Sequence, residues 1–130
     1  GGGCCEFGGS KPIGNGGILL DLKGMNNVLN LNQDNLVVTV EAGISWGKLN
    51  NFLSNYGLYT GCLGPGSGLT ASVGGGISHH SVGGGGGARY GACTNQLAGL
   101  EVVLPTGEII ETGSKVNKYS TYHFPAIRGI

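Results

Sequence analysis

The chain carries little charge, and the charge it carries is balanced. Seven lysine and arginine residues and seven aspartate and glutamate residues leave no formal net charge across 130 residues. The basic residues form no stripe along the sequence, which disfavours nucleic acid as a partner and electrostatic attachment to a membrane. No run of about 18 apolar residues is present, so no segment is predicted to span a bilayer.

The sequence also lacks the motifs of zinc sites and of P-loop enzymes. Its cysteines form no C-x-x-C pair and have no histidines at zinc spacing: Cys4, Cys5, Cys62 and Cys93. No metal site is therefore expected, and we interpret the cysteines as thiols in a reducing compartment. A cofactor-reactive or metal-binding role for the adjacent Cys4 and Cys5 is the alternative. Gly9-Ser10-Lys11 lacks the glycine spacing of a P-loop, which disfavours a GTPase or ATPase.

Glycine is the residue that the chain has in excess. It provides 29 of the 130 residues, whereas its usual share is roughly 7%. The glycines follow no period and 39% of the residues are apolar, which favours a folded domain over a silk-like or linker-like protein. Two glycine-rich loops stand out, residues 1–10 and 64–76. Because glycine lacks a Cβ, such loops can bring backbone N–H groups close to a bulky anion, and they predict a nucleotide cofactor held through its pyrophosphate.

Two hairpins are predicted from the apolar pattern. Residues 28–31 and 36–40 form the first, with asparagine and aspartate in the turn between them. Residues 100–104 and 109–112 form the second, around a Pro-Thr-Gly-Glu turn. The tail from residue 114 shows no clear period, and we expect no regular element there.

Two helices are predicted between the hairpins. Ser45 is the expected N-cap of the first, whose apolar residues recur at three- and four-residue spacing and which ends before Gly57. Ser72 is the expected N-cap of a second, shorter helix. Its free backbone N–H groups would point back at the loop of residues 65–67, where a phosphate could bind. The expected fold class is α+β, with short sheets and flanking helices.

The order of these segments resembles one known family. The segments that carry the resemblance are GGGCCEFGGSKPIGNGGILLDLKGMNNVLNLNQDNLVVTVEAGISWGKLN, PGSGLTASVGGGIS, ARYG and LAGLEVVLPTGEI. Together they resemble the FAD-binding, PCMH-type domain of the vanillyl-alcohol oxidase superfamily of FAD-linked oxidases, and are similar to its glycolate oxidase and D-lactate dehydrogenase branches. The resemblance covers nearly the whole chain. It implies that residues 1–130 are the central part of one FAD-binding domain, without its N-terminal strands, its C-terminal part and its substrate or cap domain.

The resemblance also implies which residues hold the cofactor. In that family two glycine-rich loops wrap the FAD pyrophosphate, and Ser78 and His79 occupy positions that approach the flavin. Gly83 falls in the patch of small residues that follows. The implied pyrophosphate residues are Gly1, Gly2, Gly3, Cys4, Cys5, Gly9 and Ser10 in the first loop and Pro65, Gly66, Ser67, Ser72 and Gly75 in the second. No catalytic residue is assigned.

Three departures from the family pattern matter. Cys4 and Cys5 stand where relatives usually carry threonine or serine, or the histidine that tethers FAD covalently, so non-covalent FAD is expected. His79-His80 replaces a typical Thr-Asn pair, and Val82 replaces a glycine. Arg89 is followed by tyrosine and glycine as in relatives, and we expect it to make a structural contact that orients its loop.

The implied function is that of an FAD-linked oxidase or dehydrogenase acting on a CH–OH group. Its flavin would accept a hydride equivalent from a 2-hydroxy acid or a similar small alcohol and pass the electrons to an acceptor. The expected partners are this small-molecule substrate, the electron acceptor and further subunits, in the cytoplasm. The alternatives are a non-catalytic FAD-holding or electron-transfer subunit of a larger complex, and a glycine-rich structural protein.

Overall fold

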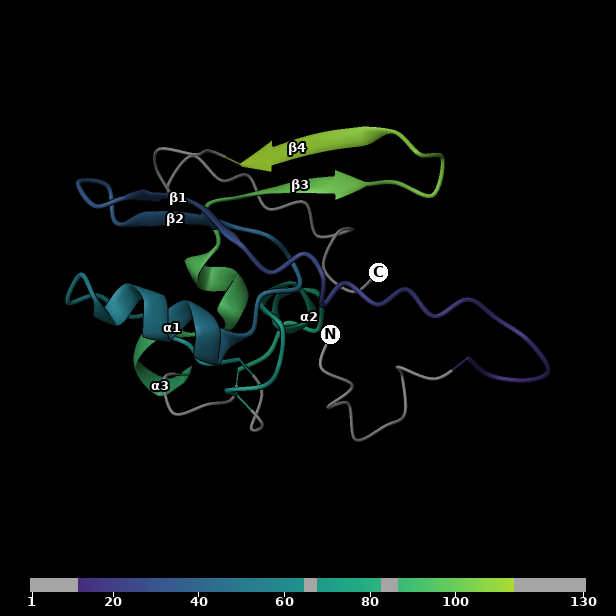
Figure 1. The fold of residues 1–130 in the computed structure, drawn as a ribbon, viewed down its shortest axis with the longest axis horizontal. Coiled ribbons are helices and arrows are strands. Elements are labelled where there is room, and N and C mark those ends of the chain that lie inside the picture. The colour runs from purple at the N-terminus through teal and green to yellow at the C-terminus, as the bar shows by residue number, and fades with distance from the viewer. Residues whose placement is uncertain (1–11, 65–67, 83–86, 114–130) are drawn as a thin grey trace.

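The computed structural model describes residues 12–64, 68–82 and 87–113 (Figure 1). The predicted tail from residue 114 lies outside these ranges. The elements of the described residues are, in chain order, β1 (Val28–Asn32), β2 (Val37–Val40), α1 (Trp46–Ser54), α2 (Val73–Ser78), α3 (Gly87–Tyr90), the 3-10 helix η1 (Cys93–Gln96), β3 (Gly99–Val103) and β4 (Ile109–Gly113). This confirms the α+β class. The sequence did not predict α3 and η1, which are only four residues long.

Both sheets are antiparallel hairpins, as predicted, with ends that agree to within one residue. β1 pairs with β2 and its register shifts between Val28 and Asn30, whereas β3 pairs with β4 in unbroken register. In the view of Figure 1 both hairpins lie above α1. The first hairpin contributes partly buried side chains to the core from both strands. They are Val28 and Leu31 of β1 and Val38 and Val40 of β2. The hairpins therefore form one side of the molecule, and the helices with their connecting loops form the other.

The core lies where α1, the start of α2 and η1 meet. Its buried members are Ile44, Trp46, Leu49, Leu53, Cys62, Ala71, Val73 and Cys93. The apolar stripe predicted for α1 is confirmed, because Trp46, Leu49 and Leu53 are all buried. Gly57 has the predicted left-handed backbone, with φ at +68°, and its N–H donates to the carbonyl of Ser54.

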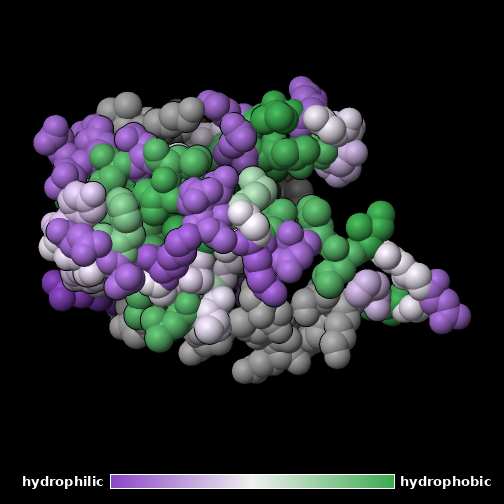
Figure 2. All heavy atoms as spheres, viewed as in Figure 1, coloured by the Kyte–Doolittle hydropathy of each residue, from purple (hydrophilic) through white to green (hydrophobic). Residues whose placement is uncertain are grey.

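One apolar segment contributes nothing to this core. Ile13 and Ile18 have exposed fractions of 101% and 95%, and Leu19 and Leu20 are exposed as well. This segment forms the arm that extends to the right in Figure 1, and its apolar residues protrude as a separate green group in Figure 2. Apolar composition alone therefore does not decide which residues of this chain are buried.

Candidate cofactor site

The starts of α1 and α2 lie against each other. Ser45 and Ser72, the two N-caps, form an isolated antiparallel bridge and have the same extended backbone, with φ at −77° and ψ at 150°. Ser45 Oγ accepts a hydrogen bond from the N–H of Lys48 at 3.1 Å. Ser72 Oγ accepts one from the N–H of Gly75 at 3.2 Å. Both predicted caps are confirmed, and the chain before each helix runs beside the chain before the other.

The first amides of α1 donate to the chain that precedes α2. The N–H of Trp46 donates to the carbonyl of Ala71 at 3.0 Å, and the N–H of Gly47 donates to that of Leu69 at 3.2 Å. A helix start leaves its first N–H groups without partners inside the helix, and they need an acceptor from elsewhere. In α1 that acceptor is the backbone of residues 69–71.

The first amides of α2 are bonded in the reciprocal way, to the chain that precedes α1. The N–H of Val73 donates to the carbonyl of Ile44 at 2.8 Å, and the N–H of Gly74 donates to that of Ala42 at 2.9 Å. The prediction that these N–H groups are free to face residues 65–67 is therefore wrong. The prediction failed because the acceptors come from a distant segment, the chain before α1, which the local sequence of α2 could not reveal. A phosphate at this helix start would have to displace those bonds.

Each of the two helices has glycine at its second position. The reason is the crossing of the two helix starts, where the chain before each helix accepts hydrogen bonds from the first turn of the other. A Cβ at Gly47 would lie 2.7 Å from the carbonyl oxygen of Leu69, and a Cβ at Gly74 would lie 2.8 Å from that of Ala42. Real Cβ atoms do not come this close to backbone oxygens. Glycine is therefore required at both positions, because the acceptor chain runs directly over the helix.

Trp46 lies between two further glycines, one on each side of its indole nitrogen. A Cβ at Gly76 would lie 2.9 Å from Nε1, and a Cβ at Gly64 would overlap the Nε1 and Cδ1 atoms of the ring. The indole Nε1 is buried and has no hydrogen-bond partner within the described residues. Gly64 directly precedes the loop of residues 65–67. Within the described residues, the core of α1 thus presents an unpartnered donor next to Gly64, where the second predicted cofactor loop begins.

Ser81 supplies a second buried polar atom of this kind. Its exposed fraction is 6%, and within the described residues its Oγ has no partner, while its carbonyl accepts from the N–H of Cys93 at 2.9 Å. It lies two residues before the glycine segment of residues 83–86. Buried hydroxyl and indole N–H groups normally find partners, and an unpartnered one calls for a ligand or another explanation. Neither atom could be predicted from the sequence, because the apolar spacing of α1 indicates only that Trp46 fills the core and no motif includes Ser81.

Four predicted cofactor residues fall within the described ranges. Ser72 and Gly75 are joined by the cap hydrogen bond at the start of α2, and Ser78 and His79 lie exposed at its end. Ser72 and His79 thus lie at opposite ends of α2, whereas Gly75 and Ser78 lie about one turn apart within it. The other predicted site residues lie outside the described ranges: Gly1, Gly2, Gly3, Cys4, Cys5, Gly9, Ser10, Pro65, Gly66, Ser67 and Gly83.

His80 ties the end of α2 to η1. Its backbone is left-handed, with φ at +50°, and its Nδ1 lies 2.6 Å from the Oγ1 of the buried Thr94. A left-handed backbone is unfavourable for a residue with a side chain, so this contact offsets a local cost.

Arg89 lies over the ring of the next residue, Tyr90, and Tyr90 contacts the loop of residues 59–61. The expected role of Arg89 in orienting its loop stays a prediction. The Arg89 guanidinium lies 5.2 Å from the centre of the Tyr90 ring, and the Tyr90 hydroxyl is 2.7 Å from that of Tyr59. That hydrogen bond raises the pKa of Tyr90. A Cβ at Gly61 would lie 2.7 Å from the same ring. Tyr90 therefore packs against residues 59–61, in the loop that leads from α1 toward residues 65–67.

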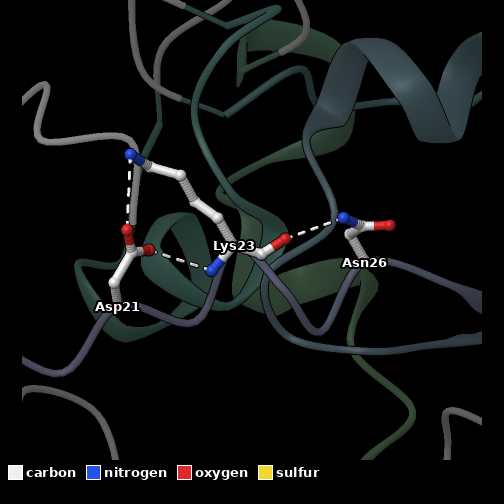
Figure 3. A network of polar contacts seen from close by, with 3 residues as sticks. All are labelled: Asp21, Lys23 and Asn26. Carbon is white, nitrogen blue, oxygen red and sulfur yellow. Dashed lines mark hydrogen bonds and ion pairs between the residues drawn. The ribbon is translucent and has the colours of Figure 1, made fainter.

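A shallow pocket of about 210 Å³ opens at the junction of the two helix starts and includes both caps, Ser45 and Ser72. Lys48 Nζ donates to the carbonyl and the Oδ1 of Asn26, at 2.8 and 2.7 Å. Figure 3 shows how Asn26 in turn donates to the carbonyl of Lys23, and how Lys23 pairs with Asp21. A hydrogen bond from the Lys23 backbone lowers the pKa of Asp21. This network holds the turn of residues 21–26 on α1 through the ammonium group of Lys48, and both Lys23 and Lys48 line the pocket.

Two further properties bear on the chemistry. Among residues 12–64, 68–82 and 87–113, histidine, cysteine, aspartate and glutamate nowhere gather in a group of three that could hold a metal ion. In the same part of the chain, every helix is too short or too polar to cross a membrane.

Comparison with known proteins gives a family match over most of the chain. Residues 1–113 match the family model described as FAD binding domain. An uncharacterized FAD-linked oxidoreductase of Mycobacterium tuberculosis is 38% identical over 122 residues, which are 93% of this chain and 26% of that protein.

Two relatives with named activities are similarly close. The mitochondrial D-lactate dehydrogenase [cytochrome] 1 of Saccharomyces cerevisiae is 40% identical over 79% of this chain and 17% of its own length. A glycolate oxidase subunit of Bacillus subtilis is 37% identical over 85% of this chain and 23% of its own length. The chain thus spans about a quarter or less of the relatives that it matches.

Proposed function

The chain belongs to the family of FAD-binding domains, and from this premise we propose that it binds FAD non-covalently as the cofactor-binding part of an FAD-linked oxidase or dehydrogenase. The observation that carries the proposal is the family match over residues 1–113, which includes both glycine-rich loops. The same match disfavours a glycine-rich structural protein.

The described residues fit such a ligand. Trp46 Nε1 and Ser81 Oγ are buried, lack partners within the described residues, and flank the two glycine segments of residues 65–67 and 83–86. FAD is rich in oxygen acceptors, which such donors require. We propose that the pyrophosphate lies on the two glycine-rich loops and that Ser78 and His79 approach the flavin. Because the first amides of α2 are already bonded to the chain before α1, the pyrophosphate would be held by the loops and not by the axis of α2.

The proposed substrate is a 2-hydroxy acid or a similar small alcohol. The yeast relative is named for D-lactate and the Bacillus relative for glycolate, and both compounds are 2-hydroxy acids. FAD, when bound, supplies the electron sink that takes a hydride equivalent from the substrate carbon and hands two electrons to an acceptor. The role of this chain is to bind and orient the cofactor and to keep water from its buried donors.

Absorption and fluorescence titrations test the cofactor. We expect the purified protein to turn yellow with FAD, and FAD to quench the emission of Trp46, the only tryptophan of the chain. Riboflavin, which lacks the pyrophosphate and the adenosine, is the matched control and should bind more weakly. Equal affinity for both compounds would overturn the pyrophosphate assignment, and absence of binding would overturn the proposed function.

Flavin bleaching tests the reaction. With FAD bound and air excluded, D-lactate or glycolate should bleach the flavin absorbance of the full-length protein that contains this chain, whereas propionate, which has no hydroxyl, should not. A protein that holds FAD but is bleached by none of a panel of 2-hydroxy acids would be a passive FAD-holding or electron-transfer subunit instead.

The variant Gly75→Val tests the second loop. Gly75 lies in the first turn of α2, and a branched side chain there would take up space beside the proposed pyrophosphate site on the loops. We therefore expect loss of FAD retention with far-UV circular dichroism largely unchanged. Gly24→Val is the matched control, because a Cβ at Gly24 would meet no atom within 4 Å. Full FAD occupancy in Gly75→Val would remove Gly75 from the site.

A further inference from the structure

Two cysteines that lie far apart in the sequence meet in the core. The Sγ atoms of Cys62 and Cys93 are 3.0 Å apart, across a separation of 31 positions in the chain. Their exposed fractions are 0% and 2%, and both are reduced thiols in this structure. A disulfide has an S–S length of about 2.05 Å, so the two sulfurs need approach by only about 1 Å to form one.

The backbones of both cysteines are held in place. The N–H of Cys62 donates to Oε1 of Gln96 at 3.2 Å, and the N–H of Cys93 donates to the carbonyl of Ser81 at 2.9 Å. Gln96 belongs to the same turn of η1 as Cys93. The contact between the thiols is therefore fixed by hydrogen bonds on both sides and does not depend on the side chains alone.

The two cysteines enclose the second predicted cofactor loop. Every predicted site residue after residue 10 lies between them: Pro65, Gly66, Ser67, Ser72, Gly75, Ser78, His79 and Gly83. So do α2, the buried Ser81 and the glycine run of residues 83–87. A bond between Cys62 and Cys93 would close this glycine-rich segment into one covalent ring.

We propose that Cys62 and Cys93 are a disulfide-forming pair that closes this segment into a covalent ring. Because the two thiols already meet in the folded protein, the cross-link mainly restricts the unfolded chain and so stabilises the folded state.

The oxidant is a low-molecular-weight disulfide such as glutathione disulfide. The thiolate of one cysteine attacks it, forms a mixed disulfide and releases one glutathione thiolate. The second cysteine, as its thiolate, then attacks the protein sulfur of the mixed disulfide and releases the second glutathione. The protein loses two thiol protons and two electrons, and one glutathione disulfide becomes two molecules of glutathione.

Burial decides when this reaction can occur. Burial and the hydrogen bond with Cys62 raise the pKa of Cys93 to about 12, so its thiolate is scarce in the folded protein at neutral pH. Glutathione disulfide is also too large to reach a sulfur with no exposed surface. The bond therefore forms as the chain folds or when this part of it opens, and once formed it is protected from reductants in the same way.

Peptide mapping tests the bond. The reduced, unfolded protein is refolded either with a reductant or in a glutathione redox buffer, then alkylated and digested with trypsin without reduction. Cleavage after Lys48, Arg89 and Lys115 puts Cys62 and Cys93 on neighbouring peptides and Cys4 and Cys5 on a third. We expect the Cys62 and Cys93 peptides to be joined after refolding in the redox buffer. Two alkylated thiols in that sample, or links to Cys4 or Cys5 instead, would overturn the proposal.

Folded protein given the same buffer is the kinetic control. It should form the link at least about tenfold more slowly than refolding protein, since its thiols are buried. Equal rates would overturn the argument from burial. The linked protein should also melt higher than the reduced protein, by on the order of 10 °C.

Discussion

The helices α1 and α2 begin in the same way but have very different bodies. Both have a serine cap with the same backbone angles, glycine at the second position, and first amides bonded to the chain before the other helix. Yet α1 has nine residues and buries three large apolar side chains, whereas α2 has six residues, of which three are glycine. Each glycine inside a helix costs about 1 kcal/mol relative to alanine. The sequence of α2 alone would not form a helix.

The difference shows what holds each element. α1 is stabilised by its own apolar stripe, and it would favour the helical state wherever that stripe is buried. α2 is stabilised by bonds from outside: Ile44 and Ala42 accept from its first turn, and His80 and Thr94 fix its last. The glycines lower the helix propensity of α2, but the absence of side chains also lets the backbone of distant segments approach it closely. A glycine-rich helix can therefore be well placed when its ends are held by distant parts of the chain.

The largest effect is expected from truncating the body of α1. Leu49→Ala should lower the free energy of unfolding by about 2–5 kcal/mol, since Leu49 is 2% exposed and its removal leaves a cavity. Ile77→Ala in α2 should cost less, because Ile77 is only partly buried. Urea unfolding followed by circular dichroism measures both, with exposed Leu29→Ala as the control. An equal loss in Ile77→Ala and Leu49→Ala would contradict the idea that the two helices are held differently.

The next effect concerns the glycine at the second position of each helix. Gly47→Ala and Gly74→Ala should each destabilise the protein by about 1–3 kcal/mol, because the new Cβ meets a backbone carbonyl that cannot move away. Helix propensity alone predicts the opposite sign, a gain of about 1 kcal/mol. The same unfolding experiment decides, and Gly24→Ala, with open space around it, should change little. Stabilisation in Gly74→Ala would mean that the crossing is not tight.

A smaller effect is expected at the caps. Ser72→Ala and Ser45→Ala each remove the acceptor of one helix amide and should cost about 0.5–2 kcal/mol. The cost should be greater at Ser72, which is 4% exposed, since water cannot replace the lost bond there. Thermal melts of the two variants and of Ser54→Ala, a serine at the end of α1, provide the comparison. A greater loss at Ser45 would reverse the ranking.

The smallest effect is expected at the end of α2. Thr94→Val keeps the volume of the side chain but removes the hydroxyl that contacts His80 Nδ1, so we expect a loss of about 1 kcal/mol. In the Thr94→Val background, His80→Gly should regain part of it, since glycine adopts the left-handed backbone without strain. Unfolding free energies of the two single variants and the double variant form the cycle. Additive losses would show that the contact does not support the turn.

Sequence reasoning succeeded where the determinant was local. Ser45, Ser72 and Gly57 act within one turn of chain, and the hairpin of residues 99–113 closes over a short turn, so each could be predicted from neighbouring residues. It failed where distant residues meet. The carbonyls that accept from the first amides of α2 belong to Ala42 and Ile44, and Cys62 contacts Cys93, which lies 31 positions away in the chain. Most of the predicted cofactor residues stay predictions, because they lie outside the described residues.

The crossing of the two helix starts also constrains how the chain folds. Neither set of first-turn amides can be satisfied until residues 42–44 and 69–71 have come together, so the two helices are closed by one event and not by two. The backbone amides of Gly47 and Gly74 should therefore exchange their hydrogens with solvent at one common rate, set by a shared opening. Their exchange should stay linked even though one belongs to a strong helix and the other to a weak one. The junction thus joins the starts of α1 and α2, which are distant in the sequence, into one cooperative folding unit.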